Sequence, residues 1–180
     1  GMFYPADAEE LAREIQSYLA AVPATQAPAP KGLIVPHAGY VYSGAVAASA
    51  YALLSLARKT IRRVVLLGPA HRVPVRGLAL PVAEAFATPL GGVRIDAEGA
   101  AAALKLPQVT ASDVAHNLEH SLEVQLPFLQ TVLDDFTLLP FAVGAATPAQ
   151  VAEVLDLLWG GPETLILISS DLSHFHTYAS

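Results

Sequence analysis

The chain has 180 residues, of which 53% are hydrophobic and 14% are charged, a composition that excludes a disordered chain and suits one domain with a buried core over residues 1–180. Its formal net charge is −6 and its basic residues form no stripe, which argues against a nucleic-acid partner. There is no cysteine, no apolar run near the length of a membrane span and no signal-peptide pattern, so we expect a cytoplasmic protein without disulfides, a thiol nucleophile or a membrane partner.

Helical periodicity predicts four helices. In the first, Asp7 stands at the N-cap position with Glu10 three residues further on, as in a capping box. Ser43 is expected to cap the second helix, and Pro127 to kink or restart the third. The four helices are expected at residues 5–22, 43–58, 119–133 and 148–159.

Short apolar runs typical of buried strands separate these helices, and turn residues at 88–96 predict a hairpin. The runs occupy residues 32–36, 63–68, 78–83, 136–143 and 164–170. Apolar runs that alternate with amphipathic helices are typical of βαβ units. The sequence therefore predicts an α/β fold of three layers, in which helices flank a mostly parallel sheet.

Three of the apolar runs end directly in polar turns. His37 follows the first run, His71 follows the second, and Asp171 and His174 follow the last. Ligands of open α/β sheets bind beyond the carboxyl ends of the strands, which parallel strands present at one edge. We therefore expect these side chains, which are distant in sequence, to meet in one crevice.

The segment "HNLEHSLE" adds further titratable side chains near the same edge. His116 and His120 lie at the start of the third predicted helix. Glu119 and Glu123 are four residues apart and share one helical face. The simpler interpretation is that Glu119 caps the helix and that Glu123 is solvated or paired with a cation.

This set of side chains favours metal chemistry over the common alternatives. Neutral imidazoles bind iron, copper, nickel or zinc, and two histidines with one carboxylate form the facial site of non-heme iron enzymes. Spare histidines suit acid–base work. No G-x-S-x-G elbow and no phosphate-binding loop is present. Tyr40 and Tyr42 flank His37, and each is explained either by core packing or by a phenol directed at a substrate.

Five motifs in series give the chain a family resemblance over essentially its whole length. They are "GMFYPAD", "VPHAGYVYSG", "LLGPAH", "EHSLEVQLPFL" and "ISSDLSHF". Together they resemble the Memo-like family, found in bacteria and archaea as AmmeMemoRadiSam system protein B. That family is similar in fold to the class III extradiol ring-cleaving dioxygenases, which use non-heme iron.

The resemblance implies roles for individual residues. His37 and His71 match the two metal-binding histidines, and His174 matches an active-site histidine that works near the substrate or in acid–base steps. His120, as a second catalytic histidine or substrate contact, and Glu123 match the motif that lines the same cleft.

Two further residues, Tyr42 and Asp171, are expected with Glu123 to contact the substrate. Members of the family usually continue well beyond "SSDLSHF" and commonly carry there a cysteine regarded as a third metal ligand. This chain has no cysteine, stops at Ser180, and also begins close to its first motif. We therefore expect a truncated chain whose third metal ligand lies outside this segment.

Three functions remain open at this point. The first is a non-heme iron, dioxygenase-like oxidoreductase, with copper or zinc as other candidate metals. The second is a non-catalytic module that binds a peptide or small ligand in the same cleft, and the third is metal-assisted hydrolysis. The family name implies a functional link to a radical-SAM protein, and the substrate stays unknown.

Overall fold

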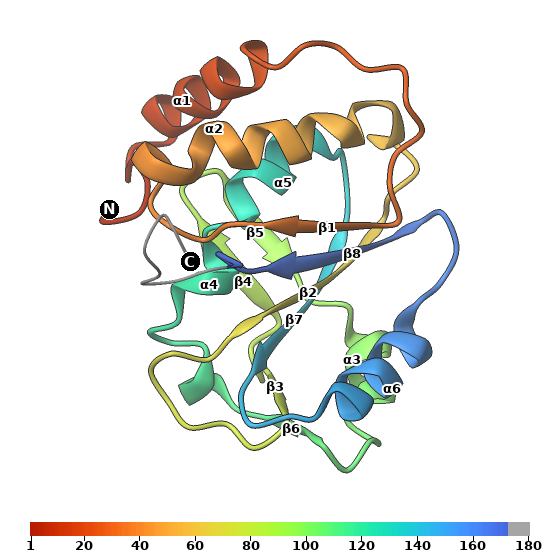
Figure 1. The fold of residues 1–180 in the computed structure, drawn as a ribbon. Coiled ribbons are helices and arrows are strands. Elements are labelled where there is room, and N and C mark those ends of the chain that lie inside the picture. The colour runs from red at the N-terminus through yellow and green to blue at the C-terminus, as the bar shows by residue number, and fades with distance from the viewer. Residues whose placement is uncertain (173–180) are drawn as a thin grey trace, which may run out of the picture.

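A six-stranded sheet forms the middle of the molecule (Figure 1). The computed structural model describes residues 1–172. In spatial order the strands are β1 (Gly32–Val35), β8 (Thr164–Ser169), β2 (Arg63–Pro69), β7 (Thr137–Val143), β3 (Leu78–Leu80) and β6 (Val109–Ala111). The first four are mutually parallel, whereas β3 runs antiparallel to β7 and parallel to β6. The predicted mostly parallel sheet is confirmed.

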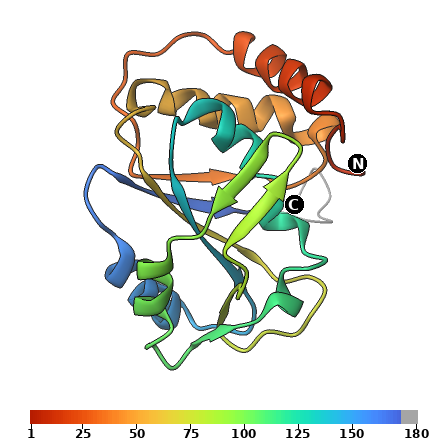
Figure 2. The same ribbon diagram turned by 180° about the vertical axis from the view of Figure 1, so that it is seen from behind.

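Helices cover both faces of this sheet, so the predicted three layers are confirmed (Figures 1 and 2). One face carries α1 (Ala8–Ala20), α2 (Tyr40–Tyr51) with the 3₁₀ helix η1 (Ala52–Ala57), and α5 (Leu126–Val132). The other face carries α3 (Ala97–Ala103) and α6 (Pro148–Leu158). The remaining elements are the hairpin β4 (Ala85–Thr88) and β5 (Gly91–Arg94), the 3₁₀ helix η2 (Asp113–Ala115) and the short helix α4 (His120–Glu123).

Local sequence signals explain most of the helix ends. The Asp7 side chain accepts the backbone N–H of Glu10 at 2.9 Å, as predicted. The prediction for Ser43 is wrong, because α2 begins three residues earlier with Gly39 at its N-cap, and the Ser43 hydroxyl donates to the carbonyl of Ala38. The third predicted helix is two helices, α4 and α5, and the proline stands in the first turn of α5, where its missing N–H costs nothing.

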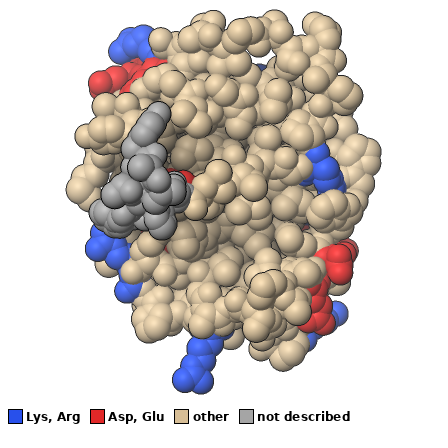
Figure 3. All heavy atoms as spheres, viewed as in Figure 1, with Lys and Arg blue, Asp and Glu red and all other residues tan. Residues whose placement is uncertain are grey.

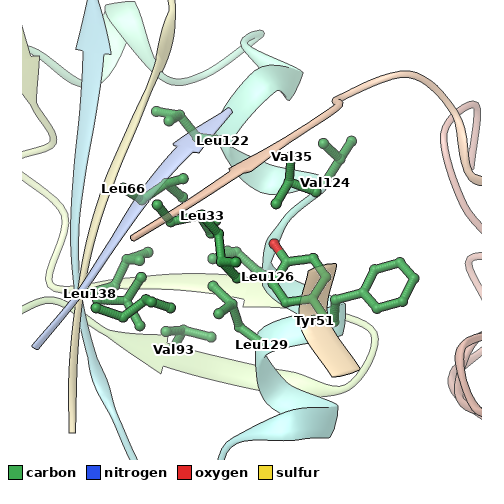
Figure 4. Close-up of a cluster of buried hydrophobic side chains, with 14 of the residues drawn as sticks. Leu33, Val35, Tyr51, Leu66, Val93, Leu122, Val124, Leu126, Leu129 and Leu138 are labelled. Atoms are coloured by element: carbon green, nitrogen blue, oxygen red, sulfur yellow. The ribbon is translucent and has the colours of Figure 1, made fainter. Parts of the chain in front are cut away.

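Two apolar clusters lie on the two faces of the sheet and hold the layers together. Figure 4 shows the larger one, in which Leu33 and Val35 of β1 meet Tyr51 of α2 and Leu129 of α5. The second cluster packs α6 against the opposite face, with Val154 fully buried. Because β2 and β7 are covered on both faces, their interiors read as continuous apolar runs rather than alternating ones.

One helical stretch of the described residues, Tyr40–Ala57, is long and apolar enough to cross a membrane by length and composition alone. The expectation that no apolar run approaches this length is therefore wrong for this stretch. Helix α2 buries Tyr40, Ala48 and Tyr51 in the cluster that covers the sheet. Its place in this core accounts for the apolar residues on its inner face.

The connections between the parallel strands determine where a crevice opens. The connection from β1 to β2 passes over β8 with α2 on one face, and the connection from β7 to β8 passes back over β2 with α6 on the other face. Right-handed connections that run in opposite directions must use opposite faces. The carboxyl ends of β1, β8 and β2 thus lie together where the connections diverge, the place where α/β sheets bind ligands.

The surface of the molecule is poor in charge. In the face drawn in Figure 3, lysine, arginine and carboxylate side chains stand mainly at the rim. Large apolar side chains are exposed on the edge strand β1, at Ile34, and on the outer face of α2, at Val41, Tyr42 and Val46. The described residues therefore leave apolar surface uncovered along β1 and α2.

Candidate functional site

Three of the predicted site residues stand at equivalent positions of neighbouring strands. His37, His71 and Asp171 are each the second residue after the end of β1, β2 and β8, respectively. Because β8 lies between β1 and β2, the two histidines start from strands about 10 Å apart. Their ring centroids are nevertheless only 5.4 Å apart, with the rings inclined at 64°. The two imidazoles therefore lean toward each other at the carboxyl edge, as the sequence predicts.

A buried carboxylate orients His71. Glu119 Oε1 lies 3.0 Å from His71 Nδ1, and Oε2 accepts the backbone N–H of the same histidine at 2.6 Å. The side chain of Glu119 is 2% exposed, whereas that of His71 is 52% exposed. The carboxylate thus anchors the inner edge of an imidazole whose outer edge faces solvent.

Glu119 also caps α4, since its side chain accepts the backbone N–H groups of His120 and Ser121. Burial alone would raise the pKa of this carboxyl, but the hydrogen bonds from His71 and Ser121 outweigh burial and hold the pKa at about 2. Glu119 is therefore a carboxylate at neutral pH. An ionised carboxylate can only accept a hydrogen bond, so the hydrogen atom between the two side chains belongs to His71 Nδ1. Nε2 is then the ring nitrogen on the solvent side.

His37 is held from two directions. Its Nδ1 lies 3.2 Å from Ser169 Oγ, and its backbone N–H donates to Asp171 Oδ1 at 2.9 Å. Asp171 Oδ2 lies 3.5 Å from His37 Nε2. Burial lowers the pKa of His37 and His71 reinforces that effect, whereas Asp171, Glu119 and a hydrogen bond with the Ser169 backbone partly offset it. His37 is thereby favoured as a neutral imidazole, the form that binds metal ions.

His120 and Glu123 lie on α4, directly after Glu119, and contact the N-terminal segment. The His120 ring stacks on Phe3 with centroids 4.3 Å apart, and the hydroxyl of Tyr4 donates to Glu123. Both residues line two adjoining cavities of about 350 and 310 Å³, the second of which also reaches Glu119. Neither cavity includes His37 or His71 in its wall. Among the described contacts, Glu119 is the link between these two parts, since it binds His71 and accepts the backbone N–H of His120.

Three other candidates have different surroundings. Tyr42 is 85% exposed on the outer face of α2, whereas Tyr40 is buried and donates to the carbonyl of Val124. His116 Nε2 lies 2.9 Å from the carbonyl of Ala79, and burial lowers the pKa of this histidine, which supports a structural role. His174, the predicted acid–base residue, lies outside the described residues.

Sequence reasoning missed three residues that hold the histidines. The sequence indicates Glu119 only as a helix cap, although the structure shows that it binds His71 as well. Ser169 and Gln125 are both 1% exposed and form a hydrogen-bonded pair beneath His37. The available signal was a polar side chain in an apolar setting: Ser169 follows "TLILI" and Gln125 stands in "LEVQLPFL".

Known proteins resemble this chain over nearly its whole length. The family described as Memo-like protein matches residues 1–179. A MEMO1 family protein of Ignicoccus hospitalis is 38% identical over 99% of this chain and 68% of its own length. A MEMO1 family protein of Aquifex aeolicus is 39% identical over 97% of this chain and 65% of its own length. Protein MEMO1 of Mus musculus is 32% identical over 97% of this chain and 61% of its own length. The chain spans about two thirds of the length of these relatives.

Proposed function

The chain belongs to the Memo-like family, and from this membership we propose that it binds a divalent metal through His37 and His71 and acts as a metal-dependent oxidoreductase. Iron is the first candidate metal, and copper and zinc are the others. The proposal includes a cytoplasmic location and a small molecule or peptide as substrate.

The observation that carries the proposal is the contact between Glu119 and His71. A buried carboxylate that holds Nδ1–H of an imidazole recurs behind histidine ligands of metal sites, where it fixes the ring and raises the basicity of the opposite nitrogen. The ring of His37 stands 5.4 Å away, centroid to centroid. Two imidazoles at this separation form a donor set that suits iron, copper or zinc.

Two histidines alone leave the coordination incomplete. Among residues 1–172, no group of three or more histidine, cysteine or acidic side chains is arranged to hold a metal ion. The proposal therefore takes at least one further ligand from outside this part of the chain. Non-heme iron with open coordination positions would supply redox chemistry with dioxygen.

The proposal also assigns roles in solvent access, substrate binding and proton transfer. The half-exposed ring of His71 leaves the site accessible from solvent. His120 and Glu123, in the walls of the adjoining cavities, are placed to contact a substrate and to exchange protons with it. His174 is proposed as a further acid–base group.

Metal analysis of the natural full-length protein, purified without oxygen, tests this proposal. The wild-type protein is expected to carry iron close to one ion per chain by mass spectrometry, and the His37→Ala/His71→Ala double variant is expected to carry none. His116→Gln serves as the control, because it removes a histidine whose imidazole is directed at a backbone carbonyl. Unchanged metal content in the double variant contradicts the proposal. Full metal content without oxygen-dependent turnover favours the non-catalytic binding module instead.

A further inference from the structure

A fully buried polar pair lies beneath His37. Ser169 is the last residue of β8, and Gln125 precedes α5. The Gln125 amide nitrogen donates to Ser169 Oγ at 2.9 Å and to the carbonyl of Pro36, also at 2.9 Å. Its amide oxygen accepts the hydroxyl of Tyr51 at 2.7 Å. These contacts fix which end of the amide is which. The carbonyl of Pro36 can only accept a hydrogen bond and so faces the amide nitrogen, whereas the hydroxyl of Tyr51 donates to the amide oxygen.

The hydrogen atoms of this pair can be counted. Ser169 has one hydroxyl hydrogen, which it donates to the carbonyl of Ser121. Ser169 Oγ therefore acts only as an acceptor toward its other neighbours, and it receives the amide hydrogen of Gln125. The remaining neighbour is His37 Nδ1 at 3.2 Å, which must carry a proton to bond with an acceptor.

We propose that Ser169 is a positioning residue that keeps a proton on Nδ1 of His37 and leaves Nε2 as the nitrogen that a metal ion would bind. Gln125 keeps the serine hydroxyl in its acceptor role. The inference rests on the proposed metal site and names the device that prepares its second histidine, since a serine does for His37 what the carboxylate does for His71. Two unlike residues, one on β8 and one before α4, thus give both histidines the same tautomer.

A competing arrangement makes the proposal testable. If Nε2 carried the proton instead, His37 would donate it toward Asp171 Oδ2, and Ser169 would have to give its hydrogen to Nδ1. The Nε2–Oδ2 distance of 3.5 Å exceeds the roughly 3.2 Å upper limit of an ordinary N–H···O bond. The carbonyl of Ser121 would also lose the hydroxyl that now donates to it. The observed contacts favour the Nδ1–H form.

Nitrogen-15 NMR of the metal-free protein at neutral pH distinguishes the two tautomers, because protonated and unprotonated ring nitrogens differ widely in chemical shift. The His37 signals are assigned by their loss in His37→Gln. The wild-type spectrum is expected to show Nδ1–H, and Ser169→Ala to shift His37 toward Nε2–H. Ser169→Thr retains a hydroxyl and is expected to restore Nδ1–H, while Ser170→Ala, the same change one residue further on, is expected to leave the tautomer unchanged.

A wild-type spectrum that shows Nε2–H overturns the inference, even if Ser169→Ala fails to fold. A Ser169→Ala spectrum identical to wild type overturns it as well. Zinc titration then separates this inference from the proposed function. Zinc affinity is expected to fall about 10- to 100-fold in Ser169→Ala and to be unchanged in Ser170→Ala. If wild-type His37 is Nδ1–H but binds no metal, the positioning role stands and the proposed function fails.

Discussion

Glu119→Gln is expected to destabilise the protein by on the order of 3 kcal/mol at neutral pH and to remove a large part of its acid sensitivity. In the folded protein the pKa of Glu119 is about 2, against an ordinary value of 4.5, and each pKa unit corresponds to about 1.4 kcal/mol. Because the folded pKa is the lower one, this stability is present above pH 4.5 and is lost as the pH falls toward 2. A neutral amide cannot replace a carboxylate that accepts four N–H groups.

Urea unfolding at a series of pH values measures this effect. The wild-type free energy of unfolding is expected to drop steeply below pH 4.5, and that of Glu119→Gln to start lower and fall less. Glu98→Gln, on the exposed side of α3, is the control for the loss of one negative charge. Metal affinity gives a second measurement, with an expected fall of about 10- to 100-fold. A variant as stable as wild type and equally sensitive to acid contradicts the role assigned to Glu119.

The parts of the fold that the sequence predicted well are those with strong local signals. The strands β2, β7 and β8 are continuous apolar runs because both of their faces are covered, and β1 is an apolar run although one of its faces is exposed. The short strand β6 and the helix α3 were not predicted. Three residues of "VTA" and seven residues of mostly alanine carry too little periodicity to be recognised. The reversed direction of β3 could not be predicted either, since it arises from its pairing with β7.

The candidate site likewise has residues that the sequence predicts and residues that it does not. Histidines after apolar runs predicted the meeting of His37 and His71, because parallel strands share a carboxyl edge. The sequence does not predict the contacts of Glu119 with His71 and of Ser169 with His37. These contacts depend on how side chains from segments far apart in the chain are oriented. The spacing of Tyr40 and Tyr42 could not say which of them faces inward until the start of α2 was known. Sequence reasoning thus identified the side chains directed at the site more readily than those that support them.

Gly77→Ala is expected to cost on the order of 4 kcal/mol of folding free energy. Gly77 lies at the end of the loop that leads from His71 to β3 and has a φ of +78°, which L-residues adopt at a cost of about 1–2 kcal/mol. A Cβ at this position would stand 2.1 Å from the carbonyl oxygen of Gln108. That oxygen cannot easily withdraw, because it accepts the backbone N–H of Leu78 at 2.9 Å.

Gly91→Ala isolates the contribution of the close contact. Gly91 also has a positive φ, +117°, but a Cβ there meets nothing within 4 Å. Gly91→Ala is therefore expected to cost about 1–3 kcal/mol from backbone strain alone, and the excess in Gly77→Ala measures the clash with Gln108. Equal costs for the two variants in urea unfolding contradict this account. The backbone at Gly77 must shift to relieve the clash, although it is hydrogen-bonded to the backbones of Ala145 and Gly144. The loop from His71 to Gly77 is expected to move with this backbone. Zinc affinity should therefore fall in Gly77→Ala and stay unchanged in Gly91→Ala under conditions where both are folded.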